Sequence, residues 1–203
     1  MSYGLIDLVF EGLDTYSEVI LNNQPLFSSD NMFVTYEKEV KSLLLVGENK
    51  LEVRFTSPIN QNKDRVNKYP YKLPSGSETV ALQVGSFTRK AAYHFGWDWG
   101  PRFVTMGIWK PVYLKFYNEV KINHVLTETK DINEDYAVQK FNIEIESRLN
   151  LNDYSLGIGD SLFSIKLKEG INTISVSIQI DHPKLWWTHD HGNPYLYLSL
   201  IHI

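Results

Sequence analysis

The sequence predicts an all-β protein made of two β-sandwich domains. Short segments that alternate apolar and polar residues recur along the 203 residues, with turn-forming residues between them. No segment carries the hydrophobic period of an amphipathic helix, and short strands at even spacing are typical of a sandwich. A polar stretch at residues 118–123 separates the two halves. We therefore expect one domain over residues 1–118 and a second over residues 119–203.

The first domain opens with an apolar segment at residues 5–10, which predicts a strand. Residues 15–21 are rich in β-branched and aromatic side chains and end at Asn22-Asn23. Because asparagine tolerates positive φ, this pair predicts a tight hairpin turn. Further strands are expected over residues 31–40 and 43–55, the second interrupted by the Gly-Glu-Asn sequence at 47–49.

Residues 57–79 differ in kind, with three prolines and little periodicity. They predict a long loop, and such a loop inside a compact domain is usually functional or mobile. Since it leads into the aromatic segment described below, we expect it on the same rim as Trp97 and Asp98. A disordered insertion is the alternative interpretation.

In the second domain, residues 141–146 alternate strictly. The pattern places Phe141, Ile143 and Ile145 inward and leaves Glu144 and Glu146 on the solvated face. Two carboxylates can act together in catalysis, but these two point to solvent, so they are not expected to be a catalytic pair.

Residues 165–170 and 172–180 predict a hairpin. Its sequence, KLKEGINTISVSI, echoes LLLVGENKLEVRF in the first half, and both place Gly-x-Asn at the bend. We interpret the echo as a common way of turning the chain, not as a domain repeat.

The most informative stretch is RKAAYHFGWDWGPRFVTMGIWKP, residues 89–111. It holds three of the five tryptophans, and Asp98 lies between two of them. The flanking glycines and Pro101 predict a loop that leaves one strand and re-enters another. An indole face beside a carboxylate suits a sugar ring, which has an apolar C–H face and a polar rim. Composition alone favours the alternative, in which the tryptophans are buried core residues.

A resemblance to a known family favours sugar binding over buried core tryptophans. RKAAYHFGWDWGPRFVTMGIWKPVYL resembles the hallmark segment of β-mannosidases of glycoside hydrolase family two, with its WDWGPR loop. LVFEGLDTYSEVILNNQPL, NMFVTYEKEV and LLLVGENKLEVRFTSP follow the order of that family's N-terminal sandwich. LWWTHDHGNPYLYLSL is similar to the end of the next, immunoglobulin-like domain, where a PYLY strand is usual. Thr188 replaces the proline of the usual LWWP motif.

The resemblance implies a galactose-binding-like jelly roll that lacks its first strands, followed by an immunoglobulin-like sandwich that lacks its last. It implies that Trp97 and Asp98 bind a terminal β-linked mannose, and that His94, Trp99 and Arg102 support the loop. Both catalytic glutamates would belong to a following (β/α)8 barrel. We therefore expect no catalytic residue and no activity on this chain, and a retaining mechanism without cofactor in the parent enzyme.

Several classes are disfavoured by composition. A formal charge of −4 without a basic cluster argues against nucleic-acid binding, and no apolar stretch approaches the ~20 residues of a membrane span. The absence of cysteine leaves the compartment open, so a soluble periplasmic or secreted location is as compatible as any other. His189-Asp190-His191 is too small a set for a metal site, and none is expected.

Two other functions remain open. One is a self-sufficient carbohydrate-binding module, and the other is a structural spacer in which the tryptophans are core. β-Galactosidase and β-glucuronidase activities share the family's domain order, and WDWGPR is the feature that favours mannose.

Overall fold

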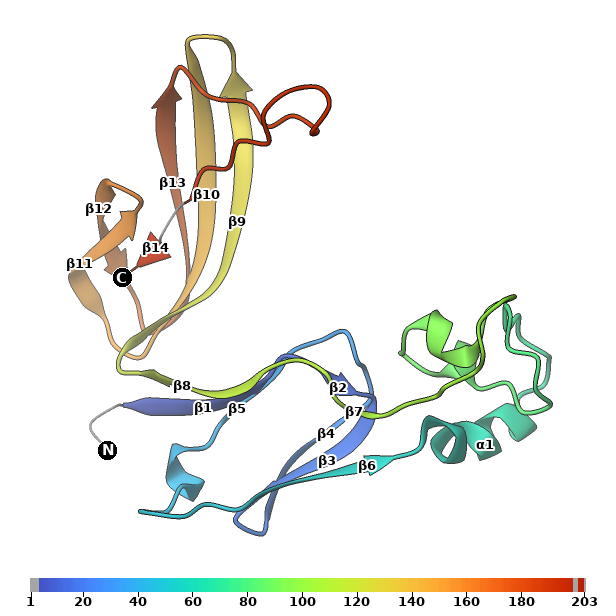
Figure 1. Cartoon of the computed structure of the whole chain (residues 1–203). Coiled ribbons are helices and arrows are strands. Elements are labelled where there is room, and N and C mark those ends of the chain that lie inside the picture. The colour runs from blue at the N-terminus through green and yellow to red at the C-terminus, as the bar shows by residue number, and fades with distance from the viewer. Residues whose placement is uncertain (1–3, 199–200, 203) are drawn as a thin grey trace. The chain divides into compact units, whose positions relative to one another are not determined.

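The computed structural model describes residues 4–198 and 201–202, and the chain folds as two units, Met1–Phe116 and Tyr117–Ile203 (Figure 1). Each unit consists mainly of β-strands arranged in small sheets. The predicted all-β fold with two sandwiches is confirmed. None of the helices in the described part of the chain is long and apolar enough to cross a membrane.

The first unit is built on two three-stranded sheets. One has the order β5 (Tyr36–Glu39), β1 (Leu5–Phe10), β8 (Val112–Tyr117), and the other the order β4 (Gln24–Ser29), β3 (Tyr16–Leu21), β6 (Leu51–Thr56). Its core residues come from both sheets and the segments between them: Ile6, Leu8, Phe10, Leu13, Val19, Leu21 and Val40. Their burial holds the two sheets face to face.

Shorter elements complete this unit. β2 (Leu13–Asp14) pairs with β7 (Gly107–Ile108), and this pairing returns the chain from the WDWG region to the sandwich. The described part of this unit also has short 3-10 helices at η1 (Lys41–Leu43), η2 (Gly85–Phe87) and η3 (Ala92–Phe95). The strands expected over 31–40 and 43–55 are shorter than predicted, since β5 begins at Tyr36 and β6 begins at Leu51.

The tight turn between β3 and β4 is confirmed. Asn22 and Asn23 have φ values of 50° and 65°, in the left-handed region that asparagine tolerates. The Asn22 side chain also donates to the Leu43 carbonyl at 2.8 Å and accepts from the Lys50 amide at 2.9 Å. One residue thus makes the turn and holds the segment that leads into β6.

The Gly-x-Asn echo corresponds to the same local structure in both units. Asn49 Oδ1 accepts from the Leu45 amide, and its Nδ2 donates to the carbonyls of Leu45 and Gly47. Asn172 makes the equivalent bonds to Lys168 and Gly170, and the two glycines have φ values of 98° and 97°. Only glycine adopts that conformation without strain.

Neither of these turns closes a hairpin, so that prediction is wrong. The first connects β5 to β6, and the second connects β12 (Ser161–Leu167) to β13 (Gly170–Asp181). In each case the two strands belong to different sheets. Alternation of apolar residues identifies a strand but does not identify its partner, which explains the error.

The loop predicted over residues 57–79 is also partly wrong, since it contains helix α1 (Pro58–Lys68). Ser57 precedes a proline at the start of the helix, where the missing amide of proline is no loss. The buried face centres on Asn62, whose Nδ2 donates to the Tyr16 hydroxyl at 2.9 Å and the Thr88 hydroxyl at 3.1 Å. Because a polar residue occupies the inner face, the sequence of α1 lacks the regular spacing of apolar residues that predicts a helix.

The second unit pairs two further sheets. One has the order β13, β10 (Tyr136–Ser147), β9 (Val120–Ile132), and the other the order β12, β11 (Leu151–Ile158), β14 (Ile201–His202). Phe141, Ile143 and Ile145 are buried between them as predicted. Glu144 and Glu146 lie on the other face, where both accept from Asn123 Nδ2.

The region after β13 is irregular. Trp186 makes an isolated bridge with Pro194, and Tyr195 to Leu198 are outside any strand, so the PYLY strand is not formed there. The Tyr197 hydroxyl instead accepts from the Lys184 amide at 2.7 Å. The remainder of the motif, residues 199–200, lies outside the described residues.

Candidate functional site

The Trp-Asp-Trp-Gly sequence forms a closed four-residue turn. The Trp97 amide donates to the Gly100 carbonyl at 3.0 Å, and the Gly100 amide donates to the Trp97 carbonyl at 3.2 Å. Gly96 enters the turn at φ 105°, which an L side chain rarely adopts. The chain arrives from η3 and not from a strand, which corrects the prediction of a strand-to-strand loop.

The two indoles of the turn face solvent. Trp97 is 51% exposed and Trp99 is 83% exposed, and their rings meet edge to face with centroids 5.8 Å apart. Trp109 is anchored differently, because its Nε1 donates to the Met32 carbonyl at 3.1 Å. The interpretation with three core tryptophans is therefore wrong.

Asp98 stands between the two tryptophans in the sequence, and its side chain is also exposed. Its Oδ1 accepts a hydrogen bond of 3.3 Å from the Ser77 hydroxyl. Within residues 4–198 and 201–202, its other carboxylate oxygen has no hydrogen-bond partner. One oxygen is thus oriented by the protein while the other can accept from a ligand hydroxyl.

A buried carboxylate, that of Glu78, binds the segment that follows the turn. Glu78, only 2% exposed, accepts from Arg102 Nη2 at 2.9 Å and Nε at 3.2 Å. It also accepts from the amides of Val84 at 3.3 Å and Gly85 at 2.9 Å. Glu78 therefore joins the segment after α1 to the segment after the WDWG turn. Of the predicted loop over residues 57–79, the last part, residues 74–78, lies beside Trp97 and Asp98.

The remaining residues singled out from the sequence also contact this region. His94 Nδ1 lies 3.3 Å from the Phe103 carbonyl and 3.2 Å from the Thr105 hydroxyl, and its ring stacks on Tyr93. Ser77 and Glu78 were missed in the sequence, because polar residues in a loop give no signal of the partners they will find.

A hollow of about 390 Å³ lies beside the turn. Trp97 and Phe95 form part of its wall, with Ser77, Glu78 and Lys90 among the other lining residues. The Lys90 ammonium is fully buried and pairs with the Asp14 carboxylate, which also accepts from the Thr15 hydroxyl at 2.5 Å. The lining of the hollow thus includes one exposed indole, that of Trp97, and the lysine of a buried ion pair.

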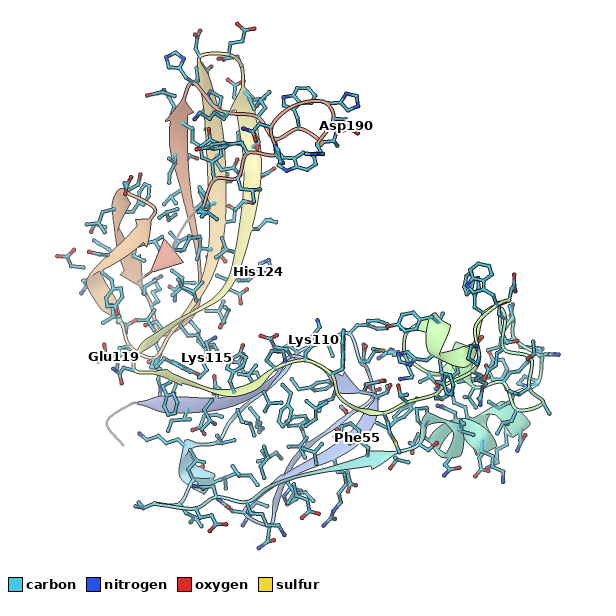
Figure 2. The ribbon with its side chains drawn as sticks, in the orientation of Figure 1. Phe55, Lys110, Lys115, Glu119, His124 and Asp190 are labelled. Carbon is cyan, nitrogen blue, oxygen red and sulfur yellow. The ribbon has the colours of Figure 1, made fainter. Side chains whose placement is uncertain are left out.

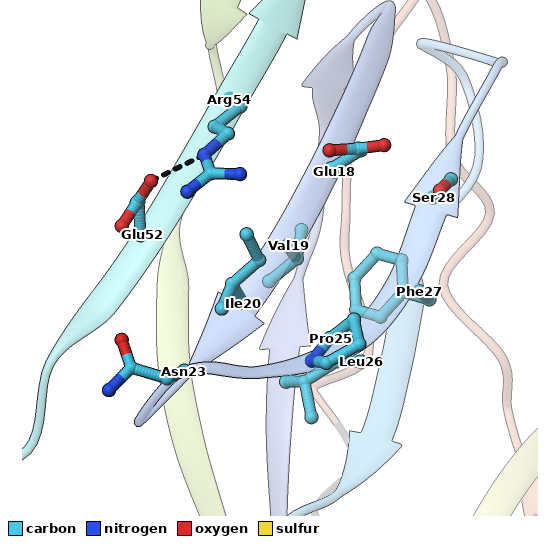
Figure 3. Close-up of a pocket in the computed structure, with 10 residues that line it drawn as sticks. All are labelled: Glu18, Val19, Ile20, Asn23, Pro25, Leu26, Phe27, Ser28, Glu52 and Arg54. Atoms are coloured by element: carbon cyan, nitrogen blue, oxygen red, sulfur yellow. Dashed lines mark hydrogen bonds and ion pairs between the residues drawn. The ribbon is translucent and has the colours of Figure 1, made fainter.

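A second hollow, of about 500 Å³, lies on the sheet of β4, β3 and β6 (Figure 3). Glu18 on β3 is the cross-strand neighbour of Arg54 on β6, whose Nε donates to Glu52 Oε1 at 2.5 Å. This hydrogen bond lowers the pKa of Glu52. Because a catalytic acid needs a raised pKa, two glutamates with an arginine between them do not suit acid–base catalysis.

Replacing Arg54 with methionine is expected to raise the pKa of Glu52 towards its ordinary value, because the hydrogen bond and positive charge that favour the carboxylate are lost. In the unaltered chain, ionised Glu52 contributes a small stabilisation above the ordinary glutamate pKa, lost as the pH falls through the lowered pKa. Carbon-13 NMR titration of the Glu52 carboxyl measures the shift, with Lys63→Met as control. An unchanged titration would contradict the assignment.

The His189-Asp190-His191 sequence lies in the irregular segment after β13, where Figure 2 labels Asp190 on the loop. All three residues are exposed. Across residues 4–198 and 201–202, no three histidine, aspartate or glutamate side chains are grouped closely enough to hold a metal ion.

Comparison with known proteins identifies the family of this chain. The profile of the family described as "Glycosyl hydrolase 2 galactose-binding domain-like" matches residues 2–110. The chain belongs to this family. The match includes the WDWG turn, the helix α1 and the sheets of the first unit apart from β8.

Sequence similarity to individual relatives extends over nearly the whole chain. A β-mannosidase of Capra hircus is 34% identical over 207 residues, covering 93% of this chain and 23% of the relative. A β-mannosidase B of Emericella nidulans is 33% identical and covers 95% of this chain, again with 23% of the relative. The resemblance to β-mannosidases is confirmed, and the chain spans about a quarter of the length of these relatives.

Solved structures agree. The crystal structure of a β-D-mannosidase from Dictyoglomus thermophilum matches 98% of this chain and 27% of its own, with a TM-score of 0.83 and 34% identity. A β-glucuronidase of glycoside hydrolase family 2 matches with a TM-score of 0.62 at 16% identity, which shows a shared fold only.

Proposed function

We propose that this chain is the sugar-recognition portion of a β-mannosidase-like glycoside hydrolase, in which the WDWG turn completes the pocket for a terminal β-linked mannose. The observation that carries the proposal is the pairing of an exposed indole, Trp97, with a carboxylate that is oriented by Ser77 and still has an accepting oxygen. The β-mannosidase relatives at 33% and 34% identity support mannose as the sugar.

The chemistry of recognition follows from these groups. Trp97 packs against the C–H face of the pyranose, which removes apolar surface from water on both sides. Asp98 accepts hydrogen bonds from ring hydroxyls, and bonds to a charged acceptor stabilise by about 1.5–3 kcal/mol each. Since Ser77 already fixes one carboxylate oxygen, less conformational freedom is lost when the sugar binds.

The catalytic groups belong to another part of the parent enzyme in this proposal. Hydrolysis with retention needs an acid/base and a nucleophile about 5 Å apart. Glu144 and Glu146 lie on an outer sheet face, and Glu52 is bonded to Arg54, which lies opposite Glu18, so neither pair suits this chemistry. The chain alone is therefore expected to be inactive, and the carboxylates are supplied by a following barrel domain.

Replacing Asp98 with alanine in the complete enzyme is expected to lower kcat/KM for a β-mannoside about 10- to 100-fold, because one or two charge-assisted hydrogen bonds to the sugar are lost. Steady-state kinetics on purified enzyme measure the effect. Asp64→Ala is the matched control, since Asp64 is an exposed aspartate on α1. An unchanged kcat/KM for Asp98→Ala would refute the proposal.

A self-sufficient carbohydrate-binding module is the second candidate, favoured by the exposure of both indoles in this chain. Titration of the chain with mannose and manno-oligosaccharides, followed by tryptophan fluorescence, separates the two. Saturable binding supports the module, and no response supports a pocket completed by the barrel.

A further inference from the structure

A third hollow, of about 400 Å³, lies next to the one beside Trp97. It is formed by the segment that follows α1 and by η2, and its walls include Tyr69, Tyr71, Phe87 and Gln83. Ser75 and Ser86 line both hollows, so the two share a wall.

The aromatic rings of this hollow contact one another and are partly open to solvent. Tyr71 is 70% exposed and Tyr69 is 41% exposed. Their rings meet edge to face with centroids 5.6 Å apart, and Tyr69 meets Phe87 in the same way at 5.3 Å. Because Tyr71 is mostly exposed, it keeps accessible ring surface on which the apolar face of a sugar can pack.

Polar groups accompany the rings. Gln83 Nε2 donates to the Glu78 carbonyl at 2.6 Å, which fixes the amide, and its side-chain oxygen has no hydrogen-bond partner among residues 4–198 and 201–202. Of the described residues that line the hollow, Lys72 alone is charged. An open ring face beside an oriented amide suits a neutral pyranose better than an anion.

We propose that the hollow of Tyr69, Tyr71 and Gln83 is a second sugar subsite, which binds the glycan residue next to the one held at Trp97 and Asp98. The order of the two residues rests on the proposed function, because it assumes that Trp97 and Asp98 hold the terminal sugar. Tyr71 stacks on the second ring, and the Gln83 amide oxygen accepts from one of its hydroxyls. The substrate class is therefore a manno-oligosaccharide of two or more residues.

Tyr71→Ala in the complete enzyme tests the subsite with two substrates. On β-1,4-linked mannotriose, kcat/KM is expected to fall about tenfold, since an aromatic contact of ~1.4 kcal/mol is lost. On methyl β-mannoside, which has no second sugar, kcat/KM is expected to stay unchanged. Tyr71→Phe keeps the ring and is expected to restore most of the activity on mannotriose.

Phe33→Ala serves as control, because Phe33 is an exposed ring, 58% accessible, that lines neither hollow. Equal kinetics of Tyr71→Ala and unaltered enzyme on mannotriose would overturn the subsite, as would an equal loss on both substrates, which indicates a structural effect. Asp98→Ala should lower kcat/KM on both substrates, since both carry the terminal sugar. If Asp98→Ala lowers kcat/KM on neither substrate while Tyr71→Ala lowers it on mannotriose alone, the proposed function fails and the subsite stands.

Discussion

Replacing Lys90 with methionine is expected to lower the free energy of unfolding of the first unit by about 3–5 kcal/mol, the usual cost of removing one partner of a buried ion pair. The Lys90 side chain is 0% exposed and that of Asp14 is 6% exposed. Methionine fills a similar volume but carries no charge, so the Asp14 carboxylate would remain buried with only the Thr15 hydroxyl as a donor.

Urea denaturation measures this loss. A background with Trp186 and Trp187 replaced by phenylalanine restricts the fluorescence signal to the three tryptophans of the first unit. Lys63→Met is the matched control, because Lys63 is exposed on α1. The double variant Asp14→Asn/Lys90→Met should recover part of the loss, since it leaves no unpaired charge. A Lys90→Met chain as stable as the Lys63→Met chain would contradict the prediction.

Glu78→Gln is expected to cost about 3 kcal/mol. The substitution keeps the size of the side chain but removes the charge that pairs with Arg102 and one of the oxygens that accept from Val84, Gly85 and Arg102. The amide group of glutamine would face donors on at least one side, which leaves a buried group unsatisfied.

The loop that holds the WDWG turn should loosen together with this loss. Limited proteolysis between residues 69 and 88 is expected to become faster, and urea denaturation gives the change in stability. Glu48→Gln, in the exposed turn before β6, is the isosteric control. Proteolysis and stability equal to those of the control would show that Glu78 does not anchor the loop.

Part of this architecture can be read from the sequence because local patterns determine it. Ile143 and Ile145 alternate with glutamates, and a strand with one buried face is the only regular structure that satisfies this order. Asn22 and Asn23 similarly specify their turn, since few other residues adopt positive φ. Both features depend on the residues themselves and not on distant partners.

Features that depend on distant partners were missed or misread. Helix α1 packs through Asn62, so its inner face is polar where an apolar stripe is expected, although Ser57-Pro58 is a signal for a helix start. The pairing of β12 with β11 and not with β13 is a choice between sheets that local alternation does not encode.

The candidate site divides in the same way. Gly96, Asp98 and the flanking tryptophans mark the turn, because glycine freedom and the unusual concentration of indoles are visible in one short segment. The residues that support the turn come from outside this short segment. Glu78 is one of many polar residues in a loop, and its burial follows from the approach of Arg102 and of the η2 backbone, which no short window contains.

The position of β1 in the middle of its sheet has a consequence for biosynthesis. β1 is the first strand described in the chain, and one of its two neighbours is β8, which ends at Tyr117. A ribosome releases β1 long before it releases β8, so one edge of β1 lacks its hydrogen-bonded neighbour while the rest of the unit is translated. During that interval the emerging polypeptide exposes a strand edge that chaperones can recognise.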